Sequence, residues 1–241
     1  MKNRTGWRTW TLVVAGLALA AGAAYAQPLP PECEVPPNTS GTVTLPPPGC
    51  EYLTGDQVHL IINGLPQGTV IVLDPIHERF ICEVQGGGGD CGSPGGNLGG
   101  EREIFGSTLR LRMSGTGALS GWSRTIPLSA NCETHTGPQT AGATTDTFAT
   151  DMHRLEGTLT NDPDFAYLHV VAGTGNGLPS PGSTTVTLQP DGTYKVDSHF
   201  NIRYRITFQG APGGRLDGFG GTTEGSVTMR SFDLEGETDC P

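Results

Sequence analysis

The sequence predicts an all-β protein, either an antiparallel β-sandwich or a flattened barrel with long strands. The strongest observation concerns residues 193–208, where apolar residues such as Tyr194 and Phe208 alternate with polar ones such as Lys195, with Ser198 as the one polar residue on the apolar face. This alternation is typical of a sheet with one dry and one solvated face. The chain also contains 37 Gly and 19 Pro, and no amphipathic helix of three turns can be traced after residue 26. Many strands, frequent turns and few helices together indicate a β fold.

The first 26 residues have the pattern of a secretory signal peptide. Lys2, Arg4 and Arg8 precede a run of small and apolar residues that ends in the cleavage pattern Ala-Tyr-Ala at 24–26. The run is shorter than the roughly 20 apolar residues of a membrane-spanning helix, which disfavours an N-terminal anchor. We therefore expect a secreted, extracytoplasmic protein with no membrane attachment after cleavage.

The chain is acidic, with 14 Lys plus Arg against 24 Asp plus Glu and a formal net charge of −10. Removal of the signal takes three cations and no anion, which leaves 11 cations against 24 anions and a net charge of −13. Nucleic-acid binding depends on Lys and Arg that displace counterions, so a nucleic-acid partner is excluded. An extracellular protein or a glycan stays open as a partner, and the sequence does not indicate an oligomeric state.

Residues 27–49 form a Pro-rich N-terminal arm, because proline cannot donate to a β-ladder. Only residues 42–45 of this arm are expected to form a short strand. Residues 50–241 are predicted to be a single β-sandwich domain with the same alternating character throughout. The alternation in residues 105–113 places Leu109 and Leu111 on the buried side, and in residues 165–171 it places His169 on the apolar face.

Six cysteines follow the predicted signal, an even number that indicates three disulfides in an oxidising compartment. Cys82 and Cys91 flank a Gly-rich loop, so we expect them to pair with each other. By elimination, Cys33 would pair with Cys50 and Cys132 with Cys240. The absence of any C-x-x-C pair disfavours a structural zinc site.

Residues 161–164, Asn-Asp-Pro-Asp, offer several oxygen atoms in one tight turn. Calcium prefers such oxygen ligands, so Asn161, Asp162 and Asp164 are a candidate calcium site. The alternative is that these side chains form Asx turns around Pro163. No other cofactor is expected.

A second candidate site lies on the polar face of residues 193–208. Asp197, His199 and Asn201 are two residues apart along one strand, so their side chains share a face and could contact a ligand. A solvated outer face explains the same residues equally well. The six histidines of the chain are otherwise scattered singly along the sequence.

The familiar catalytic motifs are missing, so the sequence favours a protein without a catalytic role. There is no G-x-S-x-G elbow, and the His77-Glu78 pair lacks the second histidine of a zinc-protease helix. One enzymatic alternative is an extracellular hydrolase of polysaccharides that uses Asp162, Asp164 or Asp197 as acid and base. Such an enzyme needs two carboxyl groups that face each other across a cleft.

Several segments resemble a secreted protein family of environmental bacteria. They are the sequences at residues 41–47, 49–52, 162–165, 177–182 and 210–214. The family has no assigned activity, so the resemblance implies no functional residue. It implies an exported module of a larger protein. From the residues themselves we expect an exported, disulfide-braced structural or ligand-binding module, with the hydrolase and a calcium-stabilised adhesion-like module as alternatives.

Overall fold

The computed structural model describes residues 33–55, 59–82 and 89–233. The predicted signal peptide, the first residues of the Pro-rich arm and Cys240 lie outside these residues. The strands are β1 (Cys33–Val35), β2 (Cys50–Leu53), β3 (His59–Ile61), β4 (Ile71–Ile81), β5 (Asp90–Pro94), β6 (Glu101–Gly115), β7 (Ser123–Thr136), β8 (Thr145–Thr160), β9 (Phe165–Ala172), β10 (Pro181–Leu188), β11 (Tyr194–Gly210) and β12 (Gly220–Asp233). Two short 3-10 helices, η1 (Gly117–Leu119) and η2 (Thr174–Asn176), complete the described elements.

The longest strand, β11, has the alternation that the sequence predicts. Every second residue from Tyr194 to Phe208 is buried, while the intervening residues from Lys195 to Thr207 are half-buried or exposed. Successive side chains of a strand point to opposite faces, so every second residue shares a face. In β11 the apolar set faces the core. Strand β6 behaves in the same way, with Leu109 and Leu111 buried as predicted.

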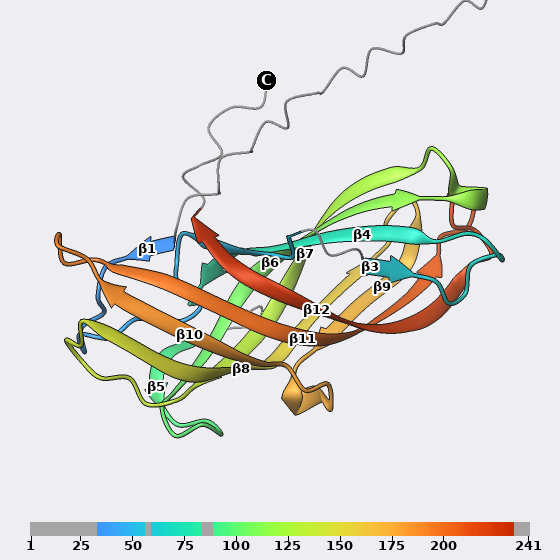
Figure 1. Ribbon diagram of the computed structural model, residues 1–241. Helices are drawn as coiled ribbons and strands as arrows, with labels where there is room; N and C mark the ends of the chain where they lie inside the picture. Colours follow the sequence, from blue (N-terminus) through green and yellow to red (C-terminus); the bar gives the residue numbers. More distant parts are fainter. Residues whose placement is uncertain (1–32, 56–58, 83–88, 234–241) are drawn as a thin grey trace, which may run out of the picture.

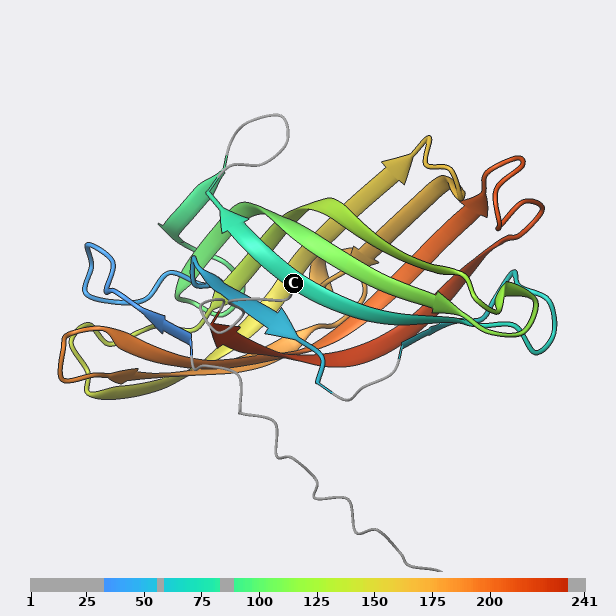
Figure 2. The same cartoon turned by 90° about the horizontal axis from the view of Figure 1, so that it is seen from above.

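The strands close into an eight-stranded antiparallel barrel (Figures 1 and 2). Around the barrel the order is β4, β2, β12, β11, a shared row of β9 and β10, then β8, β7 and β6, which pairs with β4 again. β10 bridges β8 and β11 at one end of these long strands, and β9 bridges them at the other end. Of the two predicted architectures, the structure is therefore the barrel. The described residues contain no helix long and apolar enough to cross a membrane.

Strands β4 and β5 pair with successive parts of the same edge of β6. Ile81 of β4 pairs with Gly106, and β5 continues along this edge opposite residues 101–104. The Cys82–Cys91 disulfide joins the end of β4 to the start of β5, so the predicted local bridge spans the break between the two strands. The Cys33–Cys50 disulfide is also present, and it ties β1 to β2.

Apolar side chains fill the barrel interior. A cavity among residues such as Leu73, Leu109 and Ile202 has a volume of only about 40 Å³. A cavity of roughly 150 Å³ is needed to hold a benzene-sized molecule. The interior is therefore a packed core, as is usual for an eight-stranded barrel of this kind.

The Pro-rich arm packs against the barrel in a way that the sequence did not predict. Residues 42–45 form no strand, but Val43 and Leu45 are each only 1% exposed. They join a second hydrophobic cluster with Val186 and Val196, and the Gln139 side chain hydrogen-bonds both backbone groups of Val43. Because these backbone groups are satisfied by a side chain, the segment is anchored without joining the sheet.

The predicted face of β9 was wrong. Leu168, Val170 and Ala172 are buried, whereas His169 lies on the outer side, 3.1 Å from the carboxylate of Glu156 on β8. Both faces of this strand contain apolar residues, so alternation alone could not identify the inner one.

Candidate metal centre on the outer face of the barrel

A β-bulge between β7 and β8 positions the candidate site. The ladder pairs Glu133 with Arg154 and then Thr134 with Met152, so His153 is an extra residue without an opposite partner. The extra residue places both His153 and Arg154 on the outer face of the barrel. Bulges frequently occur at functional sites because they redirect side chains in this way.

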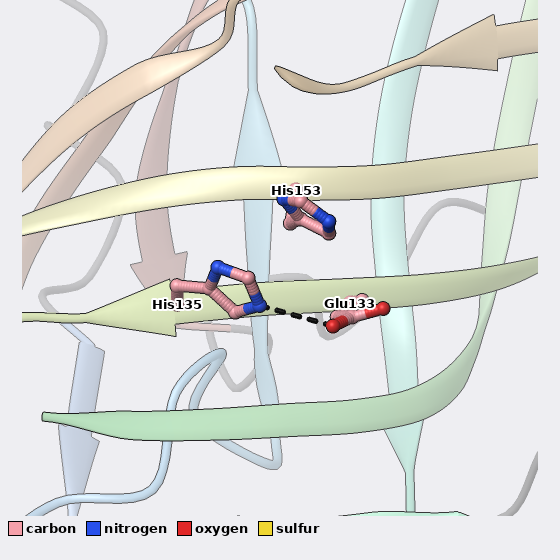
Figure 3. Close-up of side chains that lie close together, drawn as sticks. All are labelled: Glu133, His135 and His153. Carbon is pink, nitrogen blue, oxygen red and sulfur yellow. Dashed lines mark hydrogen bonds and ion pairs between the residues drawn. The ribbon is translucent and has the colours of Figure 1, made fainter. Parts of the chain in front are cut away.

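Glu133, His135 and His153 form a compact cluster of metal-ligand side chains (Figure 3). Glu133 and His135 are two residues apart on β7, so they share its outer face, and His153 projects beside them from β8. One ligand atom from each residue lies within 4.8 Å of the others. His135 Nε2 is 3.0 Å from Glu133 Oε1, and the two imidazole rings stack with their centroids 4.2 Å apart.

Two segments pack against the cluster, and His135 is only 3% exposed although it lies outside the barrel. Residues 95–100, which link β5 to β6 and are called the strap below, cross over His135, and the Asn97 N–H donates a hydrogen bond to its Nδ1 at 3.2 Å. On the other side, Gly175 of η2 lies so close to His153 that a Cβ there would be 2.6 Å from Nε2.

Two further charged groups border the cluster. Asp151 Oδ2 is 3.8 Å from His153 Nδ1, while its other oxygen accepts a hydrogen bond from the Thr174 hydroxyl at 2.6 Å. Arg154 is 3.9 Å from the Glu133 carboxylate. Within the described part of the chain, the buried Nδ1 of His153 has no hydrogen-bond partner. The cluster thus contains a nitrogen that a ligand could satisfy.

Two imidazoles and a carboxylate are a donor set for a transition metal such as zinc, nickel or copper rather than for calcium. Tetrahedral zinc at about 2.0 Å from each ligand brings the donor atoms to about 3.3 Å from one another. Binding of such an ion would therefore require the stacked rings to turn toward a common point.

At the predicted calcium site, the carboxylates of Asp162 and Asp164 are paired with the guanidinium of Arg124. Arg124 donates to Asp162 at 2.8 Å and to Asp164 at 2.6 Å, and Asp162 Oδ1 also accepts from the backbone N–H groups of Asp164 and Phe165. These backbone bonds are the Asx turn that the sequence offered as the alternative to calcium. Asn161 adopts a positive φ of 60° in the same turn. The guanidinium supplies the positive charge that a calcium ion would have supplied, so we do not propose calcium here.

The same pair lacks the general acid of a glycoside hydrolase. Burial alone would raise the pKa of Asp162 and of Asp164, but hydrogen bonds outweigh it. For Asp162 these come mainly from the Asp164 N–H and from Arg124, and for Asp164 from the Arg215 N–H, Trp122 and Arg124. The pKa of each carboxyl is therefore lowered. A general acid requires a raised pKa, because it must hold its proton near neutral pH.

The predicted ligand face lies on the outer side of β11. Asp197 and Asn201 are exposed and His199 is half-buried, as alternation requires. The Asn201 side chain accepts a hydrogen bond from Thr228, and His199 is paired across the ladder with Arg230. The three residues share a face, and their role as a ligand surface stays a prediction.

His77, Ser107 and Cys132 form a polar cluster that is buried inside the barrel. His77 Nε2 is 2.7 Å from the Ser107 hydroxyl, which is 3.3 Å from the sulfur of Cys132. Desolvation lowers the pKa of His77 to about 3 and raises that of Cys132 to about 12. Cys132 is a free thiol in the described structure, and Cys240, its predicted partner, lies outside the described residues. A neutral thiol without solvent access is not a nucleophile.

Sequence reasoning missed the Glu133, His135 and His153 cluster because it treated the histidines singly. One usable signal was present, namely Glu133-x-His135, which places two ligand types on one face of a strand. The contribution of His153 depends on the bulge and on the pairing of β7 with β8, and the sequence does not specify that pairing.

No protein-family model, curated protein or solved structure matches this chain.

Proposed function

We propose that this protein is an exported, disulfide-braced β-barrel module without a catalytic role, which binds a divalent transition-metal ion through Glu133, His135 and His153. The observation that carries the proposal is the approach of three ligand atoms to within 4.8 Å on two adjacent strands. Rigid strands hold such residues more accurately than loops do. Two disulfides in the barrel support an oxidising compartment, and hence export.

The chemistry of the cluster favours zinc, nickel or copper. Two nitrogen donors select these ions over calcium and magnesium, which prefer oxygen. The carboxylates of Glu133 and Asp151 offset the charge of a divalent cation. Copper(II) is expected to bind most tightly of the three, as it does at most sites with nitrogen and oxygen ligands.

The test is isothermal titration calorimetry of the mature chain, purified without a histidine tag, with zinc, nickel, copper and calcium in turn. The variant His153→Ala should weaken zinc binding by at least about tenfold, which is the lower end of the effect of changing even an outer-sphere residue. A matched control is His169→Ala, because His169 pairs with Glu156 on the outer face but belongs to no group of three metal-ligand side chains among the described residues. Equal zinc affinity in the two variants, or competition by calcium, would exclude the proposed centre.

A further inference from the structure

Both ring nitrogens of His135 are engaged, and the geometry fixes where its proton lies. The Asn97 N–H is 3.2 Å from Nδ1, and Glu133 Oε1 is 3.0 Å from Nε2. A backbone N–H can only donate, so Nδ1 must offer its lone pair. A neutral imidazole has one donor and one acceptor nitrogen, so Nε2 carries the proton and donates it to the Glu133 carboxylate.

Metal binding through Nε2 of His135 requires the opposite arrangement, with the lone pair on Nε2 and the proton on Nδ1. Metal-bound histidines usually donate from their second ring nitrogen to a carbonyl or a carboxylate. Here the second nitrogen, Nδ1, faces a backbone donor instead. Since a neutral imidazole has a single lone pair in its plane, Nε2 cannot bind a metal while Nδ1 accepts from Asn97.

On the basis of the proposed function, we infer that metal binding and the strap's hydrogen bond to His135 are mutually exclusive, so that a bound ion releases the strap. A metal–nitrogen bond forms with the Nε2 lone pair, and the proton from Nε2 ends on Nδ1. The hydrogen bond from Asn97 breaks, and no proton is lost to solvent. The site thereby couples metal binding to the exposure of the surface under residues 95–100.

The strap can release His135 without unfolding the strands that flank it. Its base is held by the Gly95 N–H, which donates to the Gly100 carbonyl at 2.9 Å, and by the Gly100 N–H, which donates to the Thr136 carbonyl at 3.0 Å. Neither bond involves the His135 side chain. The strap approaches the ring at Asn97, and at Gly96 an added Cβ would lie 2.8 Å from Cγ.

Nuclear magnetic resonance of the untagged mature chain tests the inference, with zinc as the probe because it is diamagnetic. Long-range proton–nitrogen spectra identify which nitrogen of His135 carries the proton, and hydrogen exchange reports on the Asn97 amide. We expect zinc to move the proton from Nε2 to Nδ1. Exchange of the Asn97 amide should become several-fold faster, up to about tenfold, as expected for loss of one hydrogen bond. The Glu101 amide, which donates to the Thr136 hydroxyl at the base of the strap, should be unchanged.

A pair of glycine variants provides an independent readout. Gly96→Ala forces a side chain against His135, whereas Gly99→Ala imposes a similar positive φ with no atom within 4 Å. Gly96→Ala should therefore loosen the strap and bind zinc several-fold more tightly than Gly99→Ala does.

The outcomes separate the two proposals. Zinc binding with an unchanged His135 proton position and unchanged Asn97 exchange would overturn the coupling and leave the metal centre intact. Equal zinc affinity of the two glycine variants would also count against the coupling. An absence of zinc binding in the wild-type chain would refute the proposed function itself.

Discussion

Replacing Arg124 by Met should expose how much the barrel depends on one ion network. Arg124 bridges Asp162 and Asp164, and Trp122 donates to the same Asp164 oxygen at 3.1 Å. The two carboxylates are 12% and 10% exposed and the guanidinium is 29% exposed, so the network is intermediate between a surface pair and a buried one. Removing one partner of a buried pair costs about 3–5 kcal/mol, and an exposed pair contributes about 0.2–1 kcal/mol. We expect a loss of about 2 kcal/mol.

Urea unfolding measures this loss. Trp122 is the only tryptophan after residue 26, so its fluorescence follows the barrel directly, and circular dichroism provides a second probe that is independent of the network. The matched control is Arg205→Met, which breaks a 2.7 Å pair with Glu224 whose partners are 45% and 40% exposed. That variant should lose less than about 1 kcal/mol. Equal losses in the two variants would refute the argument from burial.

The same network predicts how the stability difference between wild type and Arg124→Met changes with pH. The folded-state pKa of Asp162 and of Asp164 is lowered, so their contribution is complete above the unfolded pKa of about 3.9 and is lost as the pH falls through the folded pKa. The stability difference between wild type and Arg124→Met should therefore be constant near neutral pH and shrink below about pH 4. A difference that grows in acid would contradict the assignment.

Three further predictions concern the rest of the barrel. Replacing Cys33 and Cys50 by Ser should cost about 3 kcal/mol in urea unfolding, because the bridge closes a chain separation of 17 residues; an unchanged midpoint would contradict this. Cys132 should resist alkylation in the native state and react only in denaturant, since burial raises its pKa to about 12; rapid native labelling would show access. His77 should make the barrel less stable as the pH falls from about 6.5 toward its folded pKa of about 3, because only the unfolded chain takes up the proton; His77→Gln should flatten this slope.

The fold could be predicted where the two faces of a strand differ in polarity. In β11 the outward set from Lys195 to Thr207 is entirely polar, so the apolar set had to face inward and the prediction was confirmed. In β9 Tyr167 and Val171 occupy the outer face, and the pattern carried no information about which side is buried. The choice between sandwich and barrel depends on the pairing of β4 with β6, a long-range contact that no local pattern specifies.

Disulfide pairing was predictable to the extent that it is local. Cys82 and Cys91 are only nine positions apart and flank a Gly-rich stretch of sequence, so spacing alone favoured their bridge. The Cys33–Cys50 bridge followed only by elimination. The same elimination paired Cys132 with Cys240, which lies outside the described residues, and Cys132 itself is a buried cysteine beside Ser107. A buried thiol and a bridging one look identical in sequence, because free cysteine is itself one of the most buried residue types.

The candidate metal centre depends on a local break in the very pattern that predicts the fold. In β8 the inward residues Phe148 and Met152 are an even number of positions apart, but the next inward residue, Leu155, is out of phase with them. Uninterrupted alternation would point Arg154 into the core, where an unpaired guanidinium is strongly disfavoured. The bulge instead turns it outward beside Glu133, at 3.9 Å, and leaves His153 next to His135. The change of phase between Met152 and Leu155 was therefore the sequence signal for the site. It is informative only together with the charge of Arg154, which uninterrupted alternation would have placed in the core.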